Sequence, residues 1–189
     1  RGKAMQEAVP AGEGAMTAVL GMSLDEVENE INLLPKEGVC EISNDNSNTQ
    51  IVVSGTKSLI ENLNSNLKKK NKKGILLPVS APFHCSLMKK ASLNMEERIN
   101  GTDFSKPHPS IISNVTAKDE NDINKIKQLL IEQIVSKVRW RESVNYMIKS
   151  GVTDFLEIGP GKVLSGLVKK ISKDVKISNV NTLLDLKND

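Results

Sequence analysis

The sequence predicts a mixed α/β protein with two parts of different design. Across residues 15–80, apolar residues recur with a period of two in some stretches and near 3.6 in others, with turn-forming residues between them. From residue 81 onward, strand-like and helix-like stretches alternate, which favours a parallel sheet. Hydrophobic residues make up 38% of the 189 residues and charged residues 26%, a balance typical of globular proteins.

The first part begins with a buried strand predicted over residues 15–21. A helix follows, because Ser23 and Glu26 have the spacing of a capping box. Short strands are predicted over residues 39–43 and 50–54, the second ended by Gly55, with the turn-forming sequence NDNSNT between them. The sequence TKSLIENLNSNLKKKN then predicts a helix, and KGILLPVS a last strand. The apolar positions of the two helices are Leu24, Val27, Ile31 and Leu34, then Leu59, Ile60, Leu63 and Leu67.

This order of strand, helix, strand, strand, helix and strand is that of a ferredoxin-like βαββαβ unit. We expect residues 13–80 to form it as a small subdomain inserted into a larger α/β subdomain. Residues 1–12 would be a helix end of the larger subdomain, and residues 81–189 its C-terminal part. Such a fold hosts many functions, so it identifies none by itself.

The second part is predicted to contain a helix over residues 89–100, a strand over 110–116 and a helix over 122–135. Another helix follows Trp140, with Val144, Met147 and Ile148 on its apolar side. The sequence DFLEIG predicts a strand, and GPGKVLSGLVKKI a tight turn into a helix. GPGK is not a phosphate loop of the Walker type, because Val163 stands where Ser or Thr is needed.

Charge and composition restrict the classes of partner. The net charge is +3, and lysines gather at 68, 69, 70, 72 and 73, with Lys89 and Lys90 nearby. They form either a solvated helix end or a dock for an acidic partner or phosphates. An RNA-binding unit of this type would stack bases on aromatic residues of its central strands. VCEIS and QIVVS have no aromatic residue, so we expect no nucleic acid. No run of 18 apolar residues predicts a membrane span.

Two histidines are candidates for chemistry. His84 follows a hydrophobic strand, where site residues of α/β sheets concentrate, so it is either a half-buried structural histidine or a catalytic one. His108 lies between two prolines in a polar loop and is predicted to be structural. Cys85 adjoins His84, but successive side chains of an extended chain point opposite ways, which disfavours a Cys–His dyad. The spacing of the two cysteines, Cys40 and Cys85, predicts neither a disulfide nor a metal site.

Several separated motifs together resemble one family. RGKAMQEAVPAGEGAMTAVLG, NDNSNTQIVVSG, LPVSAPFHCSLM, SNVTA and FLEIGPGKVLSGLVKK resemble, in this order, the bacterial-type malonyl-CoA:acyl-carrier-protein transacylases of fatty-acid synthesis. The resemblance covers essentially the whole chain and implies the C-terminal two-thirds of such an enzyme. It also implies an α/β-hydrolase-like core, only partly present here. The acyltransferase domains of polyketide synthases share this architecture and stay an alternative.

The resemblance implies a ping-pong reaction in which a serine in a GHSLG elbow takes malonyl from malonyl-CoA. The phosphopantetheine thiol of acyl carrier protein then accepts it. His84 matches the catalytic histidine, acting as general base and then general acid. Gln133 matches the residue whose backbone carbonyl orients that histidine, unless it is an ordinary helix residue. GHSLG does not occur in the 189 residues, so we expect them to be inactive alone.

The resemblance also assigns substrate-binding residues. Arg1 matches the arginine that pairs with the free carboxylate of malonyl, and Met5, one helical turn later, would help wall that pocket. Phe83 would occupy the space that an α-methyl group needs. Asn114 would lie near the histidine. Two further matches, Asn44 and Asn46, would lie in a loop near the pantetheine arm, or are simply turn residues.

The resemblance implies no cofactor and no metal. The implied partners are acyl carrier protein and malonyl-CoA, with no nucleic acid, no membrane and a monomer when complete. A non-catalytic binding protein that kept the fold is the alternative from another class. The abundant Asn and Lys, together with a bacterial-type enzyme, favour a plastid-type organelle (apicoplast) in an AT-rich eukaryote, with bacterial cytoplasm as the alternative.

Overall fold

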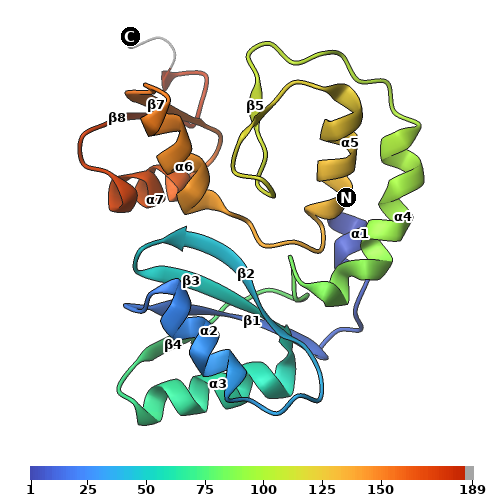
Figure 1. The fold of residues 1–189 in the computed structure, drawn as a ribbon, viewed down its shortest axis with the longest axis vertical. Helices are drawn as coiled ribbons and strands as arrows, with labels where there is room; N and C mark the ends of the chain where they lie inside the picture. Colours follow the sequence, from blue (N-terminus) through green and yellow to red (C-terminus); the bar gives the residue numbers. More distant parts are fainter. Residues whose placement is uncertain (186–189) are drawn as a thin grey trace.

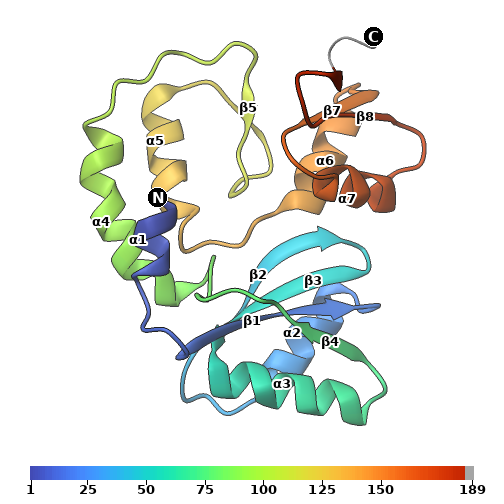
Figure 2. The ribbon, with the colours of Figure 1, turned by 180° about the vertical axis from the view of Figure 1, so that it is seen from behind.

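A computed structural model describes residues 1–185 and has a mixed α/β architecture. A four-stranded sheet with two helices forms one body, and the elements from α4 to β8 arch over its other side (Figure 1). The N-terminal helix α1 (Gly2–Gln6) lies beside α4 and α5, away from the sheet strand that follows it in sequence (Figure 2). Within residues 1–185, no helix has the length and apolar character needed to cross a membrane.

The four-stranded sheet has the strand order β2-β3-β1-β4 and is antiparallel throughout. Its helices, α2 and α3, cover one face (Figure 1). The strand–helix–strand–strand–helix–strand order predicted for residues 15–80 is therefore present. The elements are β1 (Gly14–Leu20), α2 (Leu24–Asn32), β2 (Cys40–Ser47), β3 (Gln50–Thr56), α3 (Lys57–Lys69) and β4 (Lys73–Leu76).

The sheet unit encloses its own apolar core. In α3, the residues of the predicted apolar face, from Leu59 to Leu67, are at most 4% exposed and pack with Val19, Ile51 and Val53 of the sheet. The capping box at α2 is confirmed: the Ser23 hydroxyl accepts from the Glu26 amide at 3.3 Å, and the Glu26 carboxylate accepts from the Ser23 amide at 2.8 Å. Local periodicity and local capping thus specify this unit.

Two predicted boundaries in the sheet are wrong. The sequence NDNSNT is not a turn as a whole, because β2 continues to Ser47 and only Asn48 and Thr49 turn. Its polar side chains suit a strand here because Asp45 is fully buried against an arginine rather than facing water. Gly55 does not end β3 but lies inside it, where a Cβ would come within 2.0 Å of the Val39 carbonyl oxygen.

The second part contains the predicted helices with modest shifts. Helix α4 (Lys89–Asn100) has the predicted bounds, and a 3₁₀ turn (Ser86–Met88) precedes it. Asp122 caps α5, accepting from the Lys125 amide at 2.8 Å. A parallel pair of strands closes the described chain, with a helix between them. The remaining elements are α5 (Ile123–Glu132), α6 (Trp140–Lys149), β7 (Asp154–Ile158), α7 (Val163–Ile171) and β8 (Lys176–Val180).

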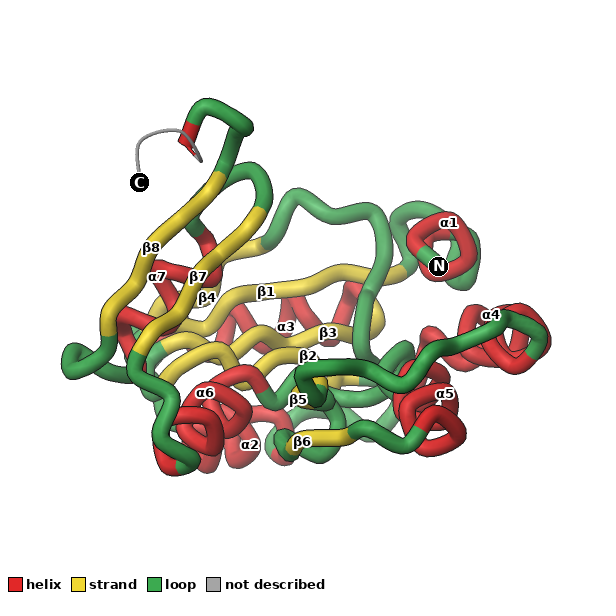
Figure 3. The backbone as a smooth tube through the Cα atoms, turned by 90° about the horizontal axis from the view of Figure 1, so that it is seen from above, coloured by secondary structure: helices red, strands yellow, loops and turns green. Residues whose placement is uncertain are grey.

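The strand predicted over residues 110–116 is mostly wrong. Only β5 (Ile111–Ile112) is extended, and it pairs with the short β6 (Asp119–Glu120). The residues between them turn, with the Ala117 amide bonded to the Ser113 carbonyl at 2.9 Å. In the described chain the parallel sheet consists of β7 and β8, and β8 was not anticipated. Viewed from above, β5 and β6 lie between α5 and α6, over the sheet edge formed by β2 (Figure 3).

Candidate functional site

His84 lies on a strained loop between β4 and the 3₁₀ turn. Its φ is +59°, a left-handed conformation that costs energy for a residue with a side chain. The loop is held on both sides of His84, by the Phe83 amide bonded to the Ala81 carbonyl and by Ser86. The Ser86 amide and hydroxyl both donate to the carboxylate of Glu41 on β2, at 2.8 and 2.6 Å. A strained residue in such a restrained loop is typical of functional sites.

The end of α5 supplies the partner of His84. Gln133 is the C-cap of α5 and is buried, with 8% exposed. Its backbone carbonyl lies 3.0 Å from Nδ1 of His84, and its side-chain Nε2 lies 3.0 Å from the same Nδ1. Because a carbonyl only accepts, the first contact requires a proton on Nδ1.

His84 Nδ1 cannot donate to the Gln133 carbonyl and accept from the Gln133 side-chain nitrogen at the same time. A protonated Nδ1 cannot accept from the Gln133 amide nitrogen, whereas the amide oxygen in the same place would accept from it. The two ends of an amide exchange places by a simple flip, but the backbone carbonyl has no such freedom. We therefore assign the proton to Nδ1, which leaves Nε2 with a free lone pair, the state of a general base.

The surroundings favour neutral His84. Burial is the main influence and lowers the imidazole pKa, and the nearby Arg1 charge lowers it further. The hydrogen bond to the Gln133 carbonyl acts in the opposite direction. Arg1 is the N-cap of α1, and partial burial lowers the pKa of its guanidinium, although arginine stays charged at neutral pH. The site thus pairs a neutral base with a fixed positive charge.

A cavity of about 110 Å³ is lined by Arg1 and Gln133. His84 is not among the described residues that line it and adjoins it through its contact with Gln133. Arg1, Asn114 and Gln133 bring polar groups to its wall, while the rest is largely apolar. Glu120 adds one carboxylate, which accepts from the amides of Asn121 and Asp122. The remaining lining residues are Ile111, Ile112, Ser113, Ile126, Leu129 and Leu130. The wall thus presents one guanidinium, one carboxylate and two side-chain amides on a largely apolar surface.

Met5 and Phe83 pack in the core beside this cavity and lie outside the described set of residues that line it. Met5 is 6% exposed and belongs to an apolar cluster with Ala81, Met88 and Ile134. Phe83 touches that cluster and also the sheet residues Met16, Ala18 and Val52. Their packing fixes the segments that carry Arg1 and His84.

The loop expected around Asn44 and Asn46 does not exist, because both residues lie within β2. Asn44 accepts from the Ser43 hydroxyl at 2.9 Å and pairs with Val138 in an isolated bridge. The bridge has a backbone hydrogen bond on each side, from the Asp45 amide to the Val138 carbonyl and from the Val138 amide to the Ser43 carbonyl. In place of the expected turn, β2 continues and its edge pairs with Val138 in the segment after Gln133.

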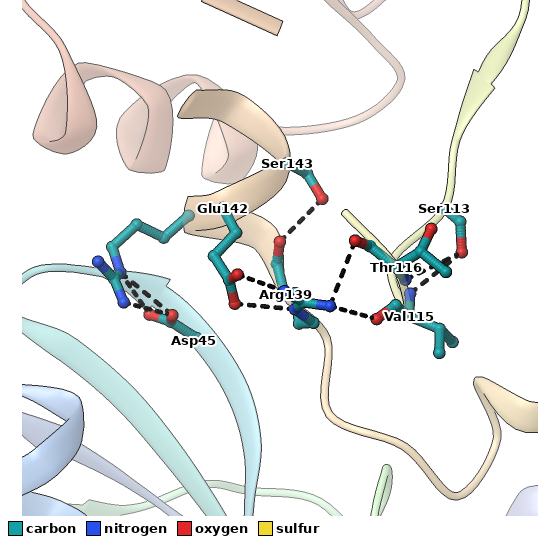
Figure 4. A network of polar contacts seen from close by, with 8 residues as sticks. Asp45, Ser113, Val115, Thr116, Arg139, Glu142 and Ser143 are labelled. Atoms are coloured by element: carbon teal, nitrogen blue, oxygen red, sulfur yellow. Dashed lines mark hydrogen bonds and ion pairs between the residues drawn. The ribbon is translucent and has the colours of Figure 1, made fainter. Parts of the chain in front are cut away.

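Sequence reasoning missed two arginines at the start of α6, and one of them, Arg139, contacts the site. Arg139 pairs with Glu142 and also donates to the carbonyls of Val115 and Thr116 in the turn that carries Asn114 (Figure 4). Arg141 makes a two-pronged ion pair with Asp45 of β2. The available signal was the dense charge of the sequence RWRE at the start of a helix.

The other sequence candidates have structural explanations. The Cys85 thiol is buried, donates to the Pro82 carbonyl at 3.1 Å and has a pKa raised by burial, so it is a poor nucleophile. Burial also raises the pKa of Cys40 to about 12, and both cysteines are free thiols. The GPGK turn leads into α7, whose second and third amides, of Leu164 and Ser165, donate to Glu157. A carboxylate of the protein therefore already occupies that helix end.

The lysine-rich segment is only partly paired. Lys70 reaches Glu30 at 2.7 Å and Lys72 reaches Glu26 at 3.8 Å, while Lys68 and Lys69 are exposed at the end of α3. Through residue 185, no group of three acidic, histidine or cysteine side chains is arranged to hold a metal ion.

Comparison with known proteins identifies one group of relatives. The malonyl CoA-acyl carrier protein transacylase of Bacillus subtilis is 47% identical over 179 residues, covering 93% of this chain and 56% of that protein. The crystal structure of an acyl carrier protein S-malonyltransferase from Vibrio cholerae matches with a TM-score of 0.94 at 38% identity, covering all of this chain and 62% of that one.

A third similar structure is a malonyl-transacylase in complex with a type II polyketide synthase acyl-carrier protein. It matches with a TM-score of 0.93 at 34% identity, covering 99% of this chain and 61% of that one. No protein-family model matches the chain. The chain thus spans 56 to 62% of the length of these relatives. Identity and fold agree over nearly all 189 residues, so the whole chain is similar to part of the malonyl CoA-acyl carrier protein transacylases.

Proposed function

We propose that the protein containing these residues transfers malonyl from malonyl-CoA to the phosphopantetheine thiol of acyl carrier protein. The observation that carries the proposal is the hydrogen bond at 3.0 Å between His84 Nδ1 and the Gln133 carbonyl, next to a cavity lined by Arg1. It prepares a base at Nε2 and offers a cation to a carboxylate in one place. The relatives described above are named for the same reaction.

In the first half-reaction, Nε2 of His84 takes the proton of a serine hydroxyl as the serine oxygen attacks the malonyl thioester carbonyl. Collapse of the tetrahedral intermediate breaks the carbon–sulfur bond. The imidazolium gives that proton to the departing CoA thiolate. The products are free CoA and a malonyl ester of the serine, with the imidazole neutral again.

The second half-reaction reverses these roles. His84 takes the proton of the phosphopantetheine thiol, the thiolate attacks the serine ester, and the proton returns to the serine oxygen. The 189 residues contain no GHSLG sequence, so the nucleophile and the oxyanion donors are proposed to come from residues outside them. In both halves Gln133 acts through its backbone, holding the imidazole in one tautomer.

Arg1 is proposed to select the acyl group. Its guanidinium offers two parallel donors to the free carboxylate of malonyl, and these bonds are stronger than neutral ones. An acetyl group leaves the guanidinium without this partner. Asn114 is proposed to contact the acyl group from the facing wall, while Met5 and Phe83 back the site. Asn44 and Asn46 are proposed to lie along the path of the pantetheine arm.

The wider assignments are proposed on the same basis. Residues 13–80 form a ferredoxin-like subdomain, inserted between residues 1–12 and 81–189 of an α/β-hydrolase-like core. The antiparallel order β2-β3-β1-β4 with two helices on one face supports the first, and the parallel β7–α7–β8 unit supports the second. The enzyme needs no cofactor and acts as a monomer, and the exposed lysines suit an acidic carrier protein. The relatives from Bacillus subtilis and Vibrio cholerae are bacterial, which favours bacterial cytoplasm over a plastid-type organelle.

A carrier protein of polyketide synthesis is the alternative partner, supported by the complex among the similar structures. Competition between fatty-acid and polyketide carrier proteins for malonyl would distinguish them by the ratio of kcat/KM values. A non-catalytic binder would load neither carrier.

The substitution Arg1→Ala tests the proposed function in the full polypeptide. Loss of a charge-assisted hydrogen-bond pair should lower kcat/KM for malonyl-CoA by about 10- to 100-fold while acetyl transfer falls little or rises. Lys3→Ala on the same helix is the matched control, because Lys3 is 87% exposed and pairs only loosely with Glu7 at 4.0 Å. Unchanged malonyl transfer in Arg1→Ala would refute the proposal.

A further inference from the structure

The turn between β5 and β6 carries Asn114 and is held from within by hydrogen bonds of Ser113. The Ser113 hydroxyl accepts from the Val115 and Thr116 amides at 3.2 and 3.5 Å. The Ala117 amide donates to the Ser113 carbonyl, and the Ser113 amide donates to the Lys118 carbonyl, both at 2.9 Å. Ala117 adopts a positive φ of +55°, which costs energy for a residue with a Cβ. The flanking strands are two residues each, so they provide little rigidity.

Arg139 adds a restraint from outside the turn. Its Nη1 donates to the carbonyls of Val115 and Thr116 at 3.0 and 3.2 Å, and its backbone amide donates to the Asn114 carbonyl at 3.0 Å. One residue therefore binds three successive carbonyls of the turn. Figure 4 shows its guanidinium reaching from the start of α6 to this turn.

Glu142 fixes the orientation of that guanidinium. Its carboxylate accepts from Nε and Nη2 of Arg139 at 2.8 and 2.5 Å, and Nη1 is left for the turn. The Glu142 pKa is lowered, chiefly by its hydrogen bond with Arg139, so the carboxylate is charged at neutral pH. A fork held on one side by a carboxylate presents its remaining donors in a fixed plane.

We propose that Arg139, oriented by Glu142, is a positioning residue that holds Asn114 in the wall of the Arg1 cavity and so sets the affinity for the malonyl group. The inference rests on the proposed function. Arg139 lines no part of that cavity among the described residues, so it acts through Asn114.

The accessibility of the Arg139–Glu142 pair argues against a role in stability alone. Their side chains are 35% and 37% exposed, and ion pairs with this exposure add little to the free energy of unfolding. Arg141 provides the contrast on the same helix, because it pairs with the fully buried Asp45 and has no hydrogen bond to the turn in the described structure.

A double-mutant cycle in the full polypeptide tests the inference. Arg139→Gln should raise KM for malonyl-CoA by about tenfold with a smaller change in kcat, since lost positioning weakens substrate contacts. The acid limb of the pH profile, which reports His84, should not move. In an Asn114→Ala background, Arg139→Gln should change KM by less than about twofold, because its effect passes through Asn114. Arg141→Lys, the matched control, should act additively with Asn114→Ala.

Hydrogen exchange tests the geometry without any dependence on malonyl transfer. Exchange of the Ala117 and Ser113 amides should accelerate about tenfold in Arg139→Gln and stay unchanged in Arg141→Lys. If Arg139→Gln fails to fold, Glu142→Gln should give smaller changes of the same sign. Equal KM effects of Arg139→Gln in both backgrounds, or unchanged exchange in the turn, would overturn the inference. A parent protein without transfer would refute the proposed function, and exchange would then decide the positioning role.

Discussion

The sheet unit of residues 14–76 and the arch of residues 81–185 each bury apolar side chains, Met88 and Ile134 among them in the arch, but they differ in how their sheets are covered. In the sheet unit, Ile60, Leu63 and Leu67 are fully buried in a core that sheet and helices close between them. In the arch, Ile158 and Val163 are 75% and 72% exposed, and the described sheets have two strands each. The arch contacts the sheet unit both through polar groups, among them the Arg141–Asp45 pair, and through Phe83, which packs on Met16, Ala18 and Val52.

The two regions contribute different things to the site. The sheet unit provides a rigid base, and the arch provides most of the chemical groups. His84, Asn114 and Gln133 come from the arch, and Arg1 comes from the short helix that packs beside α4. The segment after Gln133 contacts β2 through Val138, so the two regions meet where the site is formed.

His84→Ala should produce the largest effect on activity and little effect on stability. Loss of a general base lowers transfer by about 10³-fold, measured as kcat/KM in the full polypeptide. The free energy of unfolding should change by only about 1 kcal/mol, because one hydrogen bond is lost. Gln133→Ala retains the carbonyl that binds Nδ1 and should cost about tenfold or less. If Gln133→Ala matched His84→Ala, the assignment of the backbone carbonyl would be wrong.

Leu63→Ala should have the opposite signature. The side chain is fully buried in the sheet unit, so truncation should lower the free energy of unfolding by about 2–5 kcal/mol. Ile158→Ala in the arch removes a largely exposed side chain and should change it by about 0.5 kcal/mol or less. Urea unfolding of the 189-residue chain measures both. Equal costs would contradict the contrast between the two regions.

Arg141→Ala should destabilise the chain less than Leu63→Ala and more than Glu142→Ala. It leaves the fully buried Asp45 carboxylate without its partner. The free energy of unfolding should fall by about 2 kcal/mol, less than for a fully buried pair, because the Arg141 side chain is 27% exposed. Glu142→Ala removes an exposed pair and should cost about 0.5 kcal/mol. The same urea titration compares the two, and a reversed order would show that exposure does not govern these pairs.

Elements whose determinants are close in sequence could be predicted. The capping box needs only Ser23 and Glu26, and the buried face of α3 follows from residues three and four apart. The turn predicted for NDNSNT is wrong because its polar side chains have partners far along the chain: Asp45 is paired with Arg141, 96 residues away. The strand predicted to continue through residues 113–116 is absent, and the Arg139 guanidinium takes the place of a strand partner there.

The site followed a similar rule. Position after a strand and the family resemblance identified His84, but its strained φ and its contact with Gln133, 49 residues away, needed coordinates. The contacts of Arg139 could not be predicted because its partners are three backbone carbonyls, which every residue has.

Protonation of His84 also couples to folding in a defined direction. Because the folded-state pKa lies below its usual value near 6.5, the unfolded chain binds the proton more readily. This group therefore makes folding more favourable as pH rises toward about 6.5 and has no influence above it. Its loss in His84→Ala should flatten the pH dependence of unfolding below that value.

Nitrogen-15 NMR of the His84 ring tests the central claim, that the Gln133 carbonyl holds a neutral imidazole ready to act as a base. With assignment from a His84→Gln spectrum, we predict a neutral ring with its proton on Nδ1 and a titration midpoint below about 6.5. A neutral ring with its proton on Nε2, or a midpoint at or above that value, would contradict the account.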